Sequence, residues 1–148
     1  MNILSEEQAT ARSLALPRAS LLEDLSTEFV AEVQAAGAFV EYNQQAVIAA
    51  GEVVDYVSCI VAGRVKISRM NADYSKAEIA RLDAGEWLGE TNLFVRAPST
   101  VEVYADGEAV IWTMPADTLR DLCFHQPQGT QLLYNFGARL AQKIAPQS

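Results

Sequence analysis

Between Phe39 and Trp112 apolar residues recur with a period of two, and turn residues interrupt the pattern at close intervals. This alternation is typical of short strands with one buried face. Many short strands joined by tight turns predict an antiparallel barrel or sandwich. The expected strands are Val47–Ile48, Val57–Val61, Val65–Ile67, Ile79–Leu82, Val101–Val103 and Val110–Trp112.

Helical patterns precede this strand region. Ser5 and Gln8 form a capping box, which predicts a short first helix that Pro17 ends. Apolar residues at helical spacing then predict a second helix from about Ser20 to Ala36, with Gly37 just beyond its end.

Helical patterns also follow the strands. Pro115 suits the first position of a helix that extends toward Pro127. A last helix is expected from about Gln128, with an apolar residue at every fourth position. This stripe consists of Leu132, Phe136, Leu140 and Ile144. It fits packing on the chain's own strands and packing on a second copy equally well.

Length and charge limit what such a chain does. Its 148 residues suit one domain. The formal net charge of −8 repels a phosphate backbone, so we expect no nucleic-acid binding by this chain alone. Five basic residues in mid-chain are interpreted as a solvated strand face. They are Arg64, Lys66, Arg69, Lys76 and Arg81.

The sequence predicts a cytoplasmic protein without a membrane partner. Its apolar runs are too short to span a bilayer, and Met1–Glu7 lacks the pattern of a signal peptide. Cys59 and Cys123 are far apart and lie among apolar residues, so both are expected to be buried thiols.

Enzymatic activity is not expected. His125 is the single histidine, whereas metal-dependent barrels of the cupin type use two or three histidines and a carboxylate. The sequence also lacks the G-x-S-x-G turn of a serine nucleophile. We therefore expect neither a catalytic residue nor a metal site.

Three motifs occur in register with the expected strands. Gly51-Glu52 is followed by Ile60, Gly63 and Val65; the run 82–90 reads LDAGEWLGE; and residues 138–140 read ARL. Together they resemble the cyclic nucleotide-binding domain family, to which the ligand-binding parts of catabolite activator proteins, kinase regulatory subunits and gated channels belong.

This resemblance covers about Leu21 to Leu140. It implies a mainly β fold with flanking α-helices: an antiparallel β-roll of the jelly-roll type, with N-terminal helices, a short cassette helix and C-terminal helices. It also divides the chain into an N-terminal helical extension, residues 1–19, and a cyclic nucleotide-binding-like domain, residues 20–148.

The resemblance further implies a phosphate-binding cassette that begins at Gly89 and Glu90. In the family, backbone amides of the cassette face the cyclic phosphate, and the glutamate accepts a hydrogen bond from the ribose 2′-hydroxyl. An arginine about nine residues later pairs with the phosphate, and Ser99 stands at that position here. The site residues so implied are Gly89, Glu90, Thr91, Asn92, Arg96, Ser99 and Thr100.

Several of these residues have a second interpretation. Glu90 either accepts the ribose hydroxyl or caps turn amides of the barrel itself. Arg96 either replaces the missing phosphate partner or faces solvent. Ser99 and Thr100 either bind a ligand other than a cyclic phosphate or only continue the loop into a strand. Asn92 replaces a small residue that is usual in the family.

The resemblance implies a non-enzymatic regulatory module that senses a cyclic nucleotide, such as cAMP or cGMP, or a related small anion. The loss of the arginine implies weakened affinity. The alternatives are a protein-interaction module that has lost the ligand, and the effector domain of a transcription regulator without its DNA-binding part. Activator-type members form dimers through the helix that corresponds to residues 128–145, so a homodimer is a further expectation.

Overall fold

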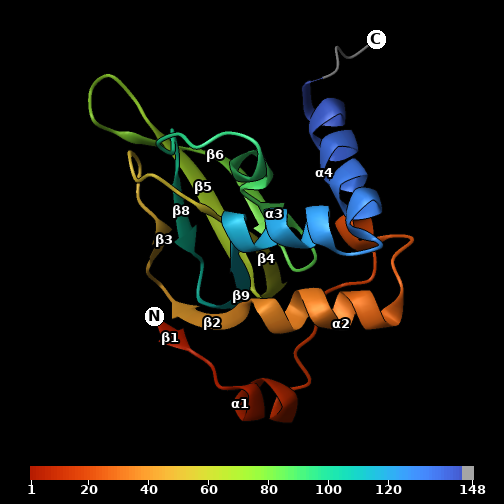
Figure 1. Cartoon of the computed structure of the whole chain (residues 1–148). Helices are drawn as coiled ribbons and strands as arrows, with labels where there is room; N and C mark the ends of the chain where they lie inside the picture. The colour runs from red at the N-terminus through yellow and green to blue at the C-terminus, as the bar shows by residue number, and fades with distance from the viewer. Residues whose placement is uncertain (145–148) are drawn as a thin grey trace.

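The computed structural model describes residues 1–144 and folds them into a roll of two antiparallel sheets flanked by helices (Figure 1). The five-stranded sheet has the order β1 (Asn2–Ile3), β2 (Ala38–Asn43), β9 (Glu108–Pro115), β4 (Tyr56–Ala62) and β7 (Trp87–Leu88). The four-stranded sheet has the order β3 (Ala46–Ile48), β8 (Glu102–Ala105), β5 (Arg64–Met70) and β6 (Lys76–Asp83). The predicted β-roll with flanking helices is confirmed.

The helices gather on one side of the roll (Figure 1). They are α1 (Glu6–Ala11), the 3-10 turn η1 (Ser20–Leu22), α2 (Thr27–Ala36), the 3-10 turn η2 (Glu90–Leu93), α3 (Ala116–His125) and α4 (Gly129–Ile144). In the part of the chain that the structure describes, none of these helices is long and apolar enough to cross a membrane.

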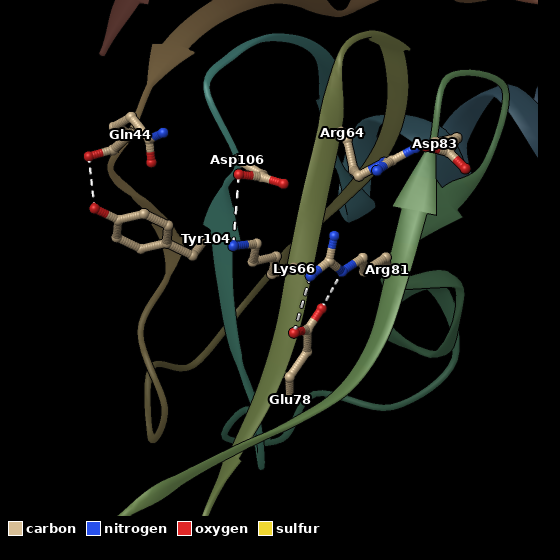
Figure 2. Close-up of polar contacts among 8 residues, drawn as sticks. All are labelled: Gln44, Arg64, Lys66, Glu78, Arg81, Asp83, Tyr104 and Asp106. Atoms are coloured by element: carbon tan, nitrogen blue, oxygen red, sulfur yellow. Dashed lines mark hydrogen bonds and ion pairs between the residues drawn. The ribbon is translucent and has the colours of Figure 1, made fainter.

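The alternation that predicted strands is visible on β5. Val65 is buried inside the roll, whereas Arg64 and Lys66 project from its outer face, where Figure 2 shows them beside acidic partners. Arg64 Nε lies 2.7 Å from Asp83 Oδ1, and Lys66 Nζ lies 3.5 Å from Asp106 Oδ1.

Other members of the basic group are also paired. Arg81 pairs with Glu78 on β6, and Lys76 Nζ lies 2.9 Å from Glu102 Oε2. The outer face of the four-stranded sheet therefore carries mixed charge, as expected of a solvated strand face. A phosphate backbone would find no concentrated positive field on these paired residues.

Two hydrophobic cores divide the interior. The larger lies between the five-stranded sheet and the helices and contains Phe29, Trp112 and Leu119. The smaller lies inside the roll, between the sheets. Its buried residues are Ile48, Val54, Ile60, Val65, Leu88, Val103 and Ile111. The smaller core supports the site described below.

The helix predicted from Ser20 to Ala36 is interrupted, and in this respect the sequence prediction was wrong. Residues 20–22 form a single 3-10 turn, Asp24 adopts a φ of 63°, and α2 begins only at Thr27. The Ser26 hydroxyl accepts a hydrogen bond from the Phe29 amide at 3.1 Å and so caps the helix. Ser26 stood inside the expected helix and was not recognised as its start.

Helix α4 packs on the roll of its own chain. Leu132 and Phe136 are fully buried, and the Phe136 ring meets the Trp87 ring edge-on at 6.0 Å between centroids. Trp87 in turn meets Trp112 at 5.9 Å between ring centroids, so both tryptophans pack in the core. Leu132 and Phe136, two residues of the predicted stripe, therefore pack against their own chain.

The N-terminal segment lies against the same core. Strand β1 pairs with β2, and Leu4, Ala9 and Leu16 are buried among core residues. The Ser5–Gln8 capping box is present at the start of α1. The division of the chain at residue 19 stays a prediction.

Candidate functional site

The segment from Gly89 to Thr100, here called the cassette, leaves the five-stranded sheet at the end of β7 and leads to β8. Gly89 adopts a φ of 75°, a left-handed conformation that glycine tolerates without strain. The short helix η2 follows at once. A Cβ atom on Gly89 would lie 2.7 Å from Asn92 Nδ2 and 3.1 Å from the Tyr56 carbonyl oxygen, so a larger residue here would displace the Asn92 side chain.

Two side chains tie η2 to the rest of the domain. Asn92 Nδ2 donates a hydrogen bond to the Tyr56 carbonyl of β4 at 3.0 Å. Arg120 Nη1 of α3 donates to the Leu93 carbonyl at 2.9 Å, at the end of η2. Asn92, which differs from the small residue usual at this position, therefore holds the cassette onto the sheet.

A cavity of about 470 Å³ lies between the cassette and the open end of the smaller core. The strand residues Ile48 and Val103 and the loop residue Val54 form its floor. The structure brings five of the predicted site residues to its wall, namely Gly89, Thr91, Asn92, Ser99 and Thr100. This volume is in the range of small-molecule sites.

Ser99, which the sequence resemblance aligns with the family's arginine, takes part in local hydrogen bonds. Its hydroxyl donates to the Val101 carbonyl at 2.7 Å, and its backbone amide donates to the Glu52 carbonyl at 2.7 Å. Gly51 N–H donates to the Ser99 carbonyl at 2.8 Å. The serine hydroxyl therefore bonds to the backbone just before β8, within its own loop.

Arg96 does not line this cavity. Its side chain is 70% exposed and lies 3.7 Å from Asp55 Oδ2. It borders a separate hollow of about 270 Å³, together with Asp117 and Arg120. The structure therefore places Arg96 in solvent, in agreement with the second of its two interpretations.

Glu90 is buried, with 3% of its surface exposed, and is turned away from the cavity wall toward α4. Its Oε1 accepts a hydrogen bond from Arg139 Nε at 2.7 Å, and its Oε2 accepts one from Lys143 Nζ at 2.9 Å. The sequence interpretations of Glu90 missed both partners. Two cations four residues apart on the last helix were the available signal.

Cys59 and Cys123 are buried in the larger core and do not line the cavity. Burial raises the pKa of Cys59, on β4, to about 12, and burial likewise raises the pKa of Cys123 to about 11. A thiol that keeps its proton is unreactive. The cavity wall itself consists of aliphatic side chains and neutral polar groups.

Residues 42–126 match the family model described as the cyclic nucleotide-binding domain. This segment contains the cassette, the strands that form the cavity, and the motif at residues 82–90. A search of curated protein sequences gave no significant match.

Solved structures show the same fold. The N-terminal domain of a transcriptional regulator from Streptomyces coelicolor A3(2) is 24% identical, with a TM-score of 0.76 over 85% of this chain and 89% of that chain. The catabolite activator protein of Thermus thermophilus is 18% identical, with a TM-score of 0.73 over 84% of this chain and 59% of that chain.

The sensor domain of the transcriptional regulator DNR from Pseudomonas aeruginosa is similar over almost its whole length. It is 21% identical, with a TM-score of 0.67 over 96% of this chain and 93% of that chain. The match covers 89% of the Streptomyces domain and 93% of the DNR sensor domain, and the present chain spans 59% of the Thermus protein.

Proposed function

Because the chain belongs to the cyclic nucleotide-binding domain family, we propose that it is a non-enzymatic regulatory module that senses a small molecule in the cassette cavity. The observation that carries this proposal is the contact of Glu90 with Arg139 and Lys143. It joins the cassette, which forms one wall of the cavity, to the last helix of the domain.

The signal would leave the cavity through this contact. Thr91 and Asn92 line the cavity, and Glu90 precedes them on the same short helix. A ligand that shifts η2 would change the distances from Glu90 to the two cations on α4. Binding that favours one position of α4 would then shift the population of the domain toward that state.

Cyclic nucleotides and related small anions are expected to bind weakly at this site. The implied ligand residues are Gly89, Glu90, Thr91, Asn92, Arg96, Ser99 and Thr100, and they lack a guanidinium at position 99. A charge-assisted hydrogen bond contributes about 1.5–3 kcal/mol. Its absence corresponds to a loss of roughly ten- to a hundredfold in affinity for cAMP or cGMP.

Calorimetric titration with cAMP and cGMP tests this proposal. We expect the wild type to bind weakly. For Ser99→Arg we expect a dissociation constant of about 1 μM. Ser99→Lys is the matched control, because an ammonium cannot form the bidentate pair and should restore less affinity. Binding by wild type as tight as by Ser99→Arg would show that position 99 does not limit affinity.

Hydrogen exchange in the same samples tests the signal. Nucleotide binding to Ser99→Arg should change the hydrogen-exchange rates of amides 139–143 on α4. Nucleotide added to a variant that does not bind it should leave these rates unchanged. If Ser99→Arg binds nucleotide without any change in α4, the proposed output through Glu90 is wrong.

Two other functions have specific support. The internal hydrogen bonds of Ser99 and Asn92 favour a protein-interaction module that keeps the fold without a ligand. The match to 59% of the Thermus activator favours the effector domain of a transcription regulator. In that case the net charge of −8 leaves DNA binding to another part of the regulator.

We further propose a cytoplasmic homodimer. Of the predicted interface at 128–145, residue 145 lies outside the described residues, and Leu132 and Phe136 are buried within the chain. Leu140 is half-buried and remains for a partner's helix. Sedimentation equilibrium should show a dimer that Leu140→Glu weakens and that Tyr134→Glu, on an exposed side chain of the same helix, leaves intact.

A further inference from the structure

The cavity beneath the cassette is lined mainly by aliphatic side chains. They come from both sheets, from the loop before β4 and from the cassette itself, and they include Ile48, Val54, Ile67, Leu88, Val95 and Val103. Four of these belong to the buried core inside the roll. The cavity is therefore an open extension of that core.

The polar part of the wall is small and partly occupied. Asn92 donates its amide to Tyr56, and Ser99 donates its hydroxyl to Val101. Thr91 and Thr100 are exposed and offer neutral hydroxyl groups at the wall. Within the described residues, the lining includes no lysine, arginine, aspartate or glutamate.

The two charged residues of the cassette are turned elsewhere. Glu90 binds Arg139 and Lys143 of α4, and Arg96 lies beside Asp55 in solvent. A phosphate placed in the cavity would lose its hydration without meeting a cation, which is costly. The net charge of −8 adds to the unfavourable potential for an anion.

From this lining we infer that the cavity takes an electroneutral, mostly apolar small molecule rather than a phosphate-bearing nucleotide. This inference rests on the proposed sensing role of the cassette and names the class of its ligand. The apolar body of the ligand would cover the floor formed by Ile48, Ile67 and Val103. A neutral polar group of the ligand would meet Thr91 or Thr100.

A matched pair of probes tests the charge preference. N-phenylnaphthylamine is neutral and fluoresces in apolar surroundings, and anilinonaphthalene sulfonate carries a sulfonate on a closely related skeleton. We expect the neutral probe to bind the wild type at least about tenfold more tightly than the sulfonate probe, because the sulfonate would be desolvated without meeting a cation. Equal or tighter binding of the sulfonate would overturn the inference.

A pair of adjacent substitutions locates the probe. Val95 is 64% exposed and lines both the cavity and the separate hollow beside Arg120, whereas its neighbour Phe94 is 49% exposed and borders that hollow but not the cavity. Val95→Glu should weaken binding of the neutral probe about tenfold or more, and Phe94→Glu should leave it nearly unchanged. Both positions are exposed, so neither variant should fail to fold.

A second apolar hollow, of about 540 Å³, borders Ile3, Val40 and Val47 and could also hold the probe. If Ile3→Glu abolishes the signal and Val95→Glu does not, the probe occupies that hollow and the inference is wrong.

Ser99→Arg provides the opposite charge test. This substitution should weaken binding of the neutral probe and strengthen binding of the sulfonate probe and of cAMP. If wild type binds cAMP more tightly than the neutral probe, the neutral-ligand inference fails while the sensing role stands. If wild type binds neither probe and neither cAMP nor cGMP, and Ser99→Arg also binds none, both proposals fail together.

Discussion

Glu90 Oε1 lies 2.7 Å from Arg139 Nε, although 49 residues separate the two in the chain. The glutamate belongs to η2 and the arginine to α4, so this contact fastens the cassette to the last helix. Lys143 adds a second cation one turn further along α4. A carboxylate with so little exposed surface is stable only with such partners.

Glu90→Gln should therefore destabilise the domain. It keeps the shape of the side chain but removes the negative charge that Arg139 and Lys143 contact. Breaking a buried pair costs about 3–5 kcal/mol. We expect about 2 kcal/mol here, because both cations are partly exposed and solvent screens them. Urea unfolding measures the free energy.

Glu102→Gln is the matched control for Glu90, because Glu102 also pairs with a lysine but on the solvated outer face. Loss of this ion pair should lower the free energy of unfolding by less than about 1 kcal/mol. Equal destabilisation by the two variants would show that the Glu90 cluster contributes no more than a surface ion pair.

Asn92→Ala should loosen the cassette. It removes the hydrogen bond to the Tyr56 carbonyl, which contributes about 1 kcal/mol. Amides 89–95 should then exchange faster with deuterium, while the strands of the larger core keep their protection. Asn71→Ala removes a comparable hydrogen bond to Ser75 in the β5–β6 turn and serves as the control. Slow exchange in the cassette of Asn92→Ala would show that Arg120 and Glu90 suffice to hold it.

Gly63 and Gly51 separate the effect of backbone conformation from that of space. Their φ angles are nearly equal, +83° and +85°. A Cβ on Gly63 would lie 2.8 Å from the Ala109 Cα of β9, whereas a Cβ on Gly51 would meet nothing within 4 Å. Gly51→Ala should cost about 1–2 kcal/mol from the left-handed conformation alone. Gly63→Ala should cost clearly more, as measured by thermal unfolding, and equal costs would contradict the steric argument.

The strands were predictable because their signal is local. Val65 and Ile67 alternate with Arg64 and Lys66 in the sequence, and the sheet simply keeps this alternation. The two-residue strands β1 and β7 were not predicted, since each is defined only by its pairing with β2 or β4. The interruption before α2 was missed because the apolar spacing continues through it.

The site was predictable in its backbone and not in its side-chain partners. The Gly-Glu motif predicted a binding loop that begins at Gly89, and five of the predicted residues line one cavity. The direction in which Glu90 points depends on where α4 packs, which is a long-range property of the fold. For the same reason the sequence could suggest the loss of the phosphate cation at Ser99, but it could not show that the cavity wall is aliphatic.

Buried thiols should make the domain less stable in alkaline solution. The pKa of Cys59 is raised by burial from 9.0 to about 12, and burial also raises the pKa values of Cys123, Tyr42 and Tyr56. Between pH 9 and 12 the unfolded chain releases the Cys59 proton while the folded chain keeps it. Stability is therefore full below pH 9 and falls as the pH rises.

Urea unfolding at pH 8 and at pH 10.5 measures this loss, which for one such group is at most about 1.4 kcal/mol per pH unit. Cys59→Ala should lower stability at both pH values, because it removes buried sulfur, yet it should reduce the difference between them. A pH dependence as steep in Cys59→Ala as in the wild type would assign the loss to the tyrosines. Stability that is unchanged between the two pH values would show that the thiol at position 59 is accessible to solvent in the folded state.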